Sequence, residues 1–201
     1  MVDTDPARDA DIDLVARVAT GDKQAFETLF TSYGERVFRY AHRLIHDVPK
    51  AEEVTNDVMI QVWKNAAKFE GRSKVSTWIL GITRHLALNA VRGRKFDTVD
   101  VDSAPEIVDL SQSAEQGSVV GEREGLKQKL RQALGQLSAD HRDVIELTFF
   151  QGCSYQEIAA IVGCPENTVK TRMFHARKQL QGILSGLGLD AGSYGAEGVA
   201  I

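Results

Sequence analysis

The sequence predicts an all-α protein with two small helical domains joined by a flexible acidic linker. Three observations support this prediction. Apolar residues recur at helical spacing through most of the chain. Residues 97–120 are rich in Asp, Ser, Val and Glu, a composition typical of a segment that cannot bury enough surface to fold. Residues 153–180 carry the local signals of a helix-turn-helix, which places that motif in the second domain.

These signals divide the 201 residues into segments; the length alone suits either one ordinary domain or two small ones. The expected segments are an acidic lead (1–13), a first domain (14–96), the linker (97–120), a second domain (121–181) and a Gly-rich tail (182–201). No apolar run is long enough to span a bilayer. The first residues are acidic and lack the apolar core of a secretory signal. We therefore expect a cytoplasmic protein.

The net charge of −4 hides a segregation of charge along the chain. The lead carries −4, the linker −6 and the tail −2, so the two predicted domains together carry +8. The acidity of the whole protein thus does not argue against a nucleic-acid partner, because the cations are concentrated in the folded parts.

The first domain begins with two predicted helices. Leu14, Val15 and Val18 indicate a short helix that stops at Gly21, and Asp22 can cap the next one. Residues 25–45 then carry one apolar stripe at helical spacing. His42 and His46 lie one turn apart on this helix and could share a metal, but with no third ligand in view we interpret them as exposed polar residues.

Asp47, Val48 and Pro49 separate the second predicted helix from a third, which is predicted for residues 51–69. One side of it is apolar. The other side is polar and by itself would be an ordinary solvated face, carrying Glu53, Asn56, Asp57, Gln61 and Lys64.

A Gly-containing loop at residues 70–76 and a helix from Thr77 to about Gly93 complete the first domain. The loop carries Arg72, Ser73 and Lys74. One flank of the helix is basic and has no acid, a surface that suits a DNA backbone or a single strand; it comprises Arg84, His85, Asn89, Arg92, Arg94 and Lys95. Trp78 could act as a wedge that melts DNA, but we interpret it as a core aromatic.

In the second domain, leucines at 126, 130, 134 and 137 mark a helix, and Ser138 can cap another. The helix-turn-helix follows. Ser154 and Glu157 have the spacing of a capping box, Gly163 can adopt the left-handed conformation that ends a helix, and Pro165 suits the start of the next.

The second helix of this motif has two faces. Val169, Met173, Ala176 and Leu180 share a buried stripe, and the opposite face shows Asn167, Thr171, Phe174 and Lys178, flanked by Lys170 and His175. Residues 166–180 also include Arg172 and Arg177, and Glu166 is their one acid. A basic exposed helix after such a turn is typical of recognition in the major groove, although a solvated face on a helical hairpin is the plainer interpretation.

Two cysteines, Cys153 and Cys164, have no CxxC spacing, and we interpret both as small, partly buried residues of the motif rather than redox groups. No glycine-rich phosphate loop, metal-ligand cluster or nucleophile–base arrangement is apparent. We therefore expect neither an enzyme nor a metal or cofactor.

The segment from Ser154 to Leu180, SYQEIAAIVGCPENTVKTRMFHARKQL, resembles region 4 of extracytoplasmic-function sigma factors of the sigma-70 superfamily. The second half, TVKTRMFHARKQL, is the more specific part. The resemblance implies a domain that binds the minus-thirty-five promoter element through Lys170, Thr171, Phe174 and His175, with Arg172, Arg177 and Lys178 anchoring phosphates. His175 departs from the more common Arg and cannot form the same pair of bonds to guanine.

The stretch AEEVTNDVMIQVW resembles region 2.2 of the same family, which binds core RNA polymerase. Asn56 and Asp57 stand where Gln and Glu are usual. The resemblance implies polymerase contacts at Glu53, Asn56, Asp57 and Gln61, and capture of the melted minus-ten strand by Arg72, Ser73, Lys74, His85, Asn89 and Arg92. His85 departs from the more common Asn. Family linkers thread the polymerase, although a passive tether explains residues 97–120 equally well.

The hypothesis is therefore a sigma factor that binds core RNA polymerase, double-stranded promoter DNA and the melted single strand. The family also implies an anti-sigma factor as a partner. Two alternatives stay open: a sigma mimic that sequesters an anti-sigma factor without binding DNA, and a stand-alone helix-turn-helix regulator. The tail is interpreted as frayed, with a regulatory extension as its alternative.

Overall fold

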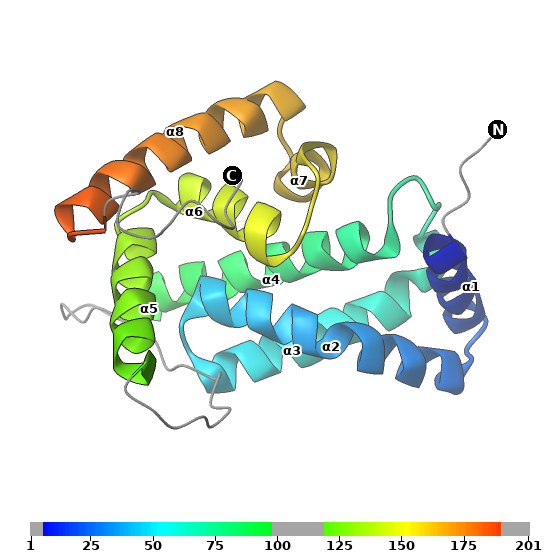
Figure 1. Ribbon diagram of the computed structural model, residues 1–201. Helices are drawn as coiled ribbons and strands as arrows, with labels where there is room; N and C mark the ends of the chain where they lie inside the picture. The colour runs from blue at the N-terminus through cyan, green and yellow to red at the C-terminus, as the bar shows by residue number, and fades with distance from the viewer. Residues whose placement is uncertain (1–5, 98–118, 190–201) are drawn as a thin grey trace. The chain divides into compact units, whose positions relative to one another are not determined.

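The computed structural model describes residues 6–97 and 119–189, and every regular element in these two ranges is helical (Figure 1). The predicted fold class is thus confirmed. The helices form two groups in chain order, α1–α4 and α5–α8. Most of the predicted linker lies outside the described residues, but Asp97 still belongs to α4 and Val119 already begins α5.

Helix α1 (Pro6–Ala19) starts well before the predicted residue 14, so the second half of the acidic lead is helical. Two features explain the earlier start. Proline is well suited to the first turn of a helix, because its fixed φ fits there and its missing N–H is not needed. The Tyr33 hydroxyl of α2 also donates a hydrogen bond to the Asp11 carboxylate, which ties this part of α1 to its neighbour.

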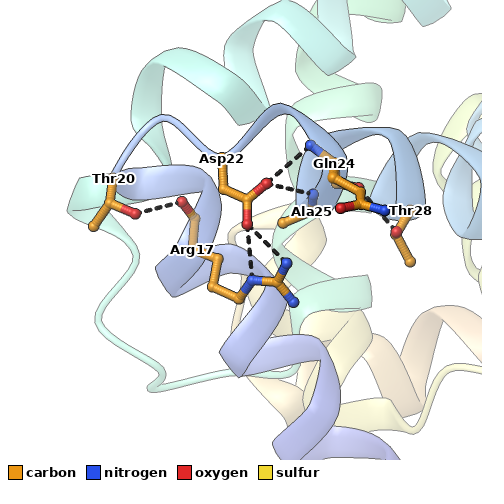
Figure 2. Close-up of polar contacts among 6 residues, drawn as sticks. All are labelled: Arg17, Thr20, Asp22, Gln24, Ala25 and Thr28. Atoms are coloured by element: carbon orange, nitrogen blue, oxygen red, sulfur yellow. Dashed lines mark hydrogen bonds and ion pairs between the residues drawn. The ribbon is translucent and has the colours of Figure 1, made fainter.

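The junction between α1 and α2 (Lys23–Ile45) is organised by Asp22, as predicted (Figure 2). Asp22 Oδ1 accepts hydrogen bonds from the backbone N–H groups of Gln24 and Ala25, at 2.9 and 3.1 Å. Its Oδ2 accepts from Arg17 Nε and Nη2, at 2.9 and 2.7 Å. The Ala25 amide and the Arg17 guanidinium together lower the pKa of the Asp22 carboxyl. Gly21, at φ 88°, makes the turn itself.

Helix α3 (Val48–Asn65) begins three residues before the predicted start. Asp47 caps it by accepting a hydrogen bond from the Lys50 amide at 2.8 Å, and Pro49 fits within the first turn. A short 3-10 turn, η1 (Ala66–Lys68), follows. Helix α4 (Val75–Asp97) is longer than predicted at both ends.

Helices α1–α4 pack on one another around a single apolar core. Leu29, Val37, Val58, Val62 and Ile79 are completely buried in it. Tyr33 is buried in this core, whereas the phenylalanine and tryptophan side chains packed against it are only partly buried. Trp63 meets Phe26 edge to face at 5.2 Å, and Trp78 packs on Phe69 at 4.9 Å, which supports the interpretation of Trp78 as a core aromatic.

The interpretation of His42 and His46 as exposed residues was wrong, because both are half-buried. His42 stacks on Phe38 at 5.9 Å, and burial lowers the pKa of its imidazole. His46 ends α2 in the left-handed conformation, at φ 56°.

The second group consists of α5 (Val119–Gly135), α6 (Ala139–Ile145), a π-helical turn η2 (Glu146–Phe150), α7 (Tyr155–Val162) and α8 (Glu166–Gly186). Ser138 caps α6 as predicted, accepting from the His141 amide at 3.3 Å. Helix α8 packs on α5 and α6. Buried apolar residues in this group include Ala133, Val144, Leu147 and Met173.

Helix α8 continues five residues into the predicted tail. Ile183 and Leu184 are half-buried, which favours the helix despite the nearby glycines. It ends where Gly188 adopts φ 74° and the Leu189 amide donates to the Leu184 carbonyl at 2.9 Å, the bond of a Schellman motif. Residues 190–201 lie outside the described residues. Within the described ranges, none of the helices is both long and apolar enough to span a membrane.

Candidate nucleic-acid interface

The turn between α7 and α8 has the predicted local chemistry. Helix α7 begins directly after Ser154. Gly163 lies at φ 72° and its amide donates to the Ala159 carbonyl at 3.0 Å, which ends the helix. Pro165 stands at the N-cap of α8, and its carbonyl accepts from the amides of Thr168 and Val169 at 2.9 and 3.3 Å.

The two faces of α8 are those predicted. Val169, Met173 and Ala176 are buried, with at most 2% of their surface exposed. Leu180 is half-buried at the end of the same stripe. Of the residues predicted to contact the minus-thirty-five element, only Arg172 is half-buried. The others are exposed; they are Lys170, Thr171, Phe174, His175, Arg177 and Lys178. Phe174 is an apolar ring that is 64% exposed, and a partner surface would bury it favourably.

The cations of α8 differ in their surroundings. Lys170 Nζ lies 2.7 Å from Glu166 Oε1, one turn away on the same helix. Arg172 Nη2 lies 2.6 Å from Asp140 Oδ2, which belongs to α6. The Arg177 guanidinium stands over the Phe149 ring, 5.7 Å from its centroid. Lys178 lies at an open hollow, which is lined by His141, His175, Lys178 and Gln179.

His175 lies between two aromatic neighbours. Its ring is 5.3 Å from Phe174, edge to face, and 6.4 Å from His141 of α6, nearly parallel. His141 Nδ1 in turn lies 3.1 Å from Gln179 Oε1. These contacts hold the His175 ring on the exposed side of α8, near the residues predicted to contact bases.

The residues predicted to hold the minus-ten strand lie in the loop before α4 and along its exposed flank. Arg72 forms an ion pair with Glu70, and Ser73 Oγ donates to the Lys74 carbonyl at 3.3 Å. On α4, His85, Asn89 and Arg92 are exposed, and the Asn89 amide nitrogen lies 3.1 Å from His85 Nε2. The side chains of Arg94 and Lys95 lie outside the described residues.

The predicted polymerase face occupies the exposed side of α3. Glu53, Asn56 and Asp57 are exposed, and Gln61 is half-buried. Glu53 is paired with Lys50 at 2.8 Å, and Gln61 Oε1 accepts from the Asn65 amide at 2.9 Å. The face is not purely polar, because Ile60 stands on it with 46% of its surface exposed.

Comparison with known proteins decides the family. Residues 29–96 match Sigma-70 region 2, and residues 127–180 match Sigma-70, region 4, together more than half of the chain. The RNA polymerase sigma-H factor of Pseudomonas aeruginosa is 31% identical over 186 residues, covering 90% of this chain and 96% of that protein. The ECF RNA polymerase sigma-E factor of Escherichia coli K12 is 32% identical over 180 residues, covering 83% and 90%.

The chain belongs to the extracytoplasmic-function sigma factors of the sigma-70 family. The predicted family and function are thus confirmed: this sigma factor acts in transcription initiation and is not an enzyme. A solved structure of the sigma factor RpoE of Bartonella quintana, crystallised with the anti-sigma factor NepR, matches with a TM-score of 0.63 at 28% identity. The match covers 80% of this chain and 96% of that one.

Three candidate residues of this sigma factor were missed by the sequence analysis. Ile60 could have been found as the apolar member of an otherwise polar helical face. The other two, Asp140 and His141, lie some thirty residues before the α8 side chains that they contact. No local signal identifies those contacts, because they depend on how α6 packs against α8.

Proposed function

We propose that this sigma factor binds core RNA polymerase through the exposed face of α3 and binds the two promoter elements through α4 and α8. The observation that carries the DNA-binding part is the division of α8. Val169, Met173 and Ala176 of its apolar stripe are buried and Leu180 is half-buried, whereas its opposite side exposes cations, a hydroxyl, a histidine and a phenylalanine. A helix with this division can enter the major groove without exposing its core residues.

At the minus-thirty-five element, Lys170, Thr171, Phe174 and His175 would contact base edges. Arg177 and Lys178, further along the helix, would bind phosphates, which supplies affinity without sequence information. Phe174 offers an apolar contact of the kind that suits a thymine methyl group.

At the minus-ten element, the opened strand would lie along the loop and flank that carry Arg72, Ser73, Lys74, His85, Asn89 and Arg92. On the flank of α4 the described charged residues are the cations Arg84 and Arg92, which suits a single strand. Arg72 and Lys74 of the loop, by contrast, are paired with Glu70 and Glu157 and would have to exchange these carboxylates for phosphates.

At the polymerase, Asn56, Asp57 and Gln61 would form polar contacts around Ile60, with Glu53 at the margin. In such a complex Ile60 would be buried at the centre of the contact while the polar side chains form its wet rim. Ile60 is therefore added to the residues expected from the sequence.

An anti-sigma factor is proposed as a further partner, supported by the B. quintana relative, which was crystallised with one. The site of action would be the cytoplasm, where bacterial polymerase and promoter DNA are found.

The test is transcription by the purified protein with bacterial core polymerase on a pool of genomic promoter fragments, followed by mapping of start sites. We expect initiation downstream of a shared two-part motif. Lys170→Ala should weaken or shift the upstream element, and Asp57→Ala and Ile60→Ala should weaken polymerase binding. Lys23→Ala and Glu35→Ala are matched controls, because both side chains are exposed on α2, away from the proposed contacts.

Each alternative has its own outcome. Binding to polymerase without initiation would favour a sigma mimic, and a pull-down for an anti-sigma partner would follow. No binding to polymerase by the folded protein would contradict the proposal and leave a stand-alone DNA-binding regulator.

A further inference from the structure

Arg172 differs from the other cations of the recognition helix α8. Its side chain is only 27% exposed, and its Nη2 atom lies 2.6 Å from Asp140 Oδ2 in the first turn of α6. Lys170, by contrast, is 53% exposed and paired with Glu166 of its own helix. The Lys170 pair lies within one rigid element, whereas the Arg172 pair joins two elements that are packed together.

A second set of contacts joins the same turn of α6 to α8. His141, next to Asp140, places its Nδ1 atom 3.1 Å from Gln179 Oε1, and its ring packs beside that of His175. Arg172, His175 and Gln179 are spaced three and four residues apart, so they lie on one flank of α8. The start of α6 therefore contacts about two turns of α8, on both sides of His175.

We propose that the Asp140–Arg172 ion pair fixes the rotation of α8 about its axis. Arg172 is then a positioning residue that acts through Asp140, and it does not anchor a phosphate. This inference rests on the proposed binding of the minus-thirty-five element by α8. Thr171 and Lys170 immediately precede Arg172, so a rotation of the helix at this point moves both side chains relative to the base edges. Hydrogen bonds to bases weaken steeply when the donor–acceptor distance lengthens or the angle at the hydrogen departs from linear.

The ion pair is partly exposed, since Asp140 has 54% of its side-chain surface in solvent. Such pairs contribute little to the stability of a fold. The loss of the pair should therefore leave the protein folded and show itself in DNA binding.

The two alternative roles of Arg172 predict opposite changes in promoter affinity when Asp140 is substituted. If Arg172 leaves Asp140 to bind a phosphate, the substitution Asp140→Asn frees the guanidinium and removes a negative charge near DNA. Promoter binding should then tighten. If Arg172 positions α8 through Asp140, the same substitution should weaken promoter binding. Glu166→Gln is the matched control, because it removes one carboxylate paired with a cation of α8 without touching the contact to α6.

The experiment measures the binding of reconstituted holoenzyme to a promoter fragment with its minus-thirty-five element, at several salt concentrations. We expect Asp140→Asn and Arg172→Gln each to weaken binding by about threefold or more, and the pair of changes together to be clearly less than additive. The slope of log affinity against log salt should stay unchanged in Arg172→Gln, since no phosphate contact is lost. Glu166→Gln should bind at least as tightly as the wild type. The reciprocal exchange, Asp140→Arg with Arg172→Asp, should recover part of the lost affinity.

Thermal melting of each variant serves as the check on folding. Tighter binding by Asp140→Asn, or a salt slope lower by about 0.9 in Arg172→Gln, would overturn the inference and make Arg172 a phosphate contact. If the wild-type holoenzyme forms but does not recognise the minus-thirty-five element, the proposed function of α8 fails and the inference falls with it. These outcomes are distinguishable, because the first two require a wild type that binds.

Discussion

His175 is an exposed residue of the recognition helix at a position where the family resemblance implies arginine as the more common residue. A histidine offers single hydrogen bonds, whereas an arginine can donate two parallel bonds to the O6 and N7 atoms of guanine. The exposed His175 ring is held between Phe174 and His141. We therefore expect this sigma factor to tolerate more bases at the position facing His175 than relatives with arginine.

The substitution His175→Arg should sharpen that preference toward guanine. A bidentate contact discriminates against the wrong base by about 1–3 kcal/mol, so the ratio of affinities for guanine and other bases should rise about tenfold. Binding to a library of minus-thirty-five sequences measures this ratio. His175→Lys is the control, since it adds charge without the planar fork and should raise the affinity with a smaller gain in guanine preference than His175→Arg.

His42 makes the stability of the first domain depend on pH. Burial, and secondarily Arg43, lowers the pKa of the half-buried imidazole below its ordinary value. The unfolded state therefore binds more protons than the folded state just below about pH 6.5. Above that pH His42 is neutral in both states and does not reduce the free energy of unfolding. As the pH falls toward the folded-state pKa, the free energy of unfolding decreases, because the imidazole is protonated more readily in the unfolded state.

The wild type should thus lose more stability than His42→Gln between pH 7.5 and 5.5. Urea unfolding at both pH values gives the difference between the two proteins. A difference that does not change with pH would show that His42 titrates alike in both states.

Among the elements, the turn between α7 and α8 depends on Gly163. At φ 72° an alanine would be strained, although an added Cβ would meet no atom within 4 Å. The substitution Gly163→Ala should therefore cost only the left-handed backbone strain, about 1–2 kcal/mol. Gly163→Asn should cost less, because asparagine tolerates this conformation better.

Gly182→Ala on α8 is the matched control for chemical denaturation. Its added Cβ would also meet nothing within 4 Å, and its φ is not positive. This substitution should stabilise the helix by up to about 1 kcal/mol. If both alanine variants shifted stability in the same direction, the explanation from backbone strain would be wrong.

The elements also show why some features could be predicted from the sequence and others could not. The turn at Gly163 and Pro165 and the cap at Asp22 are local, so the sequence alone predicts them correctly. The early start of α1 was missed because it is supported by the contact between Asp11 and Tyr33, 22 residues apart. The partner of Arg172 was missed for the same reason, since Asp140 belongs to another helix.

At the scale of the whole molecule, charge is segregated rather than balanced. The protein is acidic, with a pI near 5.8, yet the predicted domains carry +8 and α8 exposes several cations. Attraction to DNA is therefore local to these surfaces and is screened by salt.

Lys178→Ala tests this electrostatic contribution. A lost phosphate contact should lower the slope of log affinity against log salt by about 0.9 and weaken matched and scrambled promoters equally. Lys170→Ala should weaken the matched promoter more than the scrambled one. Holoenzyme binding to both fragments at several salt concentrations measures the slopes, and a selective effect of Lys178→Ala would place that lysine on a base.

The ion pair between Lys170 and Glu166 has a consequence for how the protein searches a genome. A bacterial chromosome offers millions of competing sites, and each attracts bare cations regardless of sequence. With a carboxylate beside it, Lys170 gains little by exchanging that partner for a random phosphate. It gains more where a correctly placed base acceptor compensates for the exchange. If Lys170 contacts a base as proposed, we expect the carboxylate on the recognition helix to shorten the time spent at wrong sites more than the time spent at a promoter.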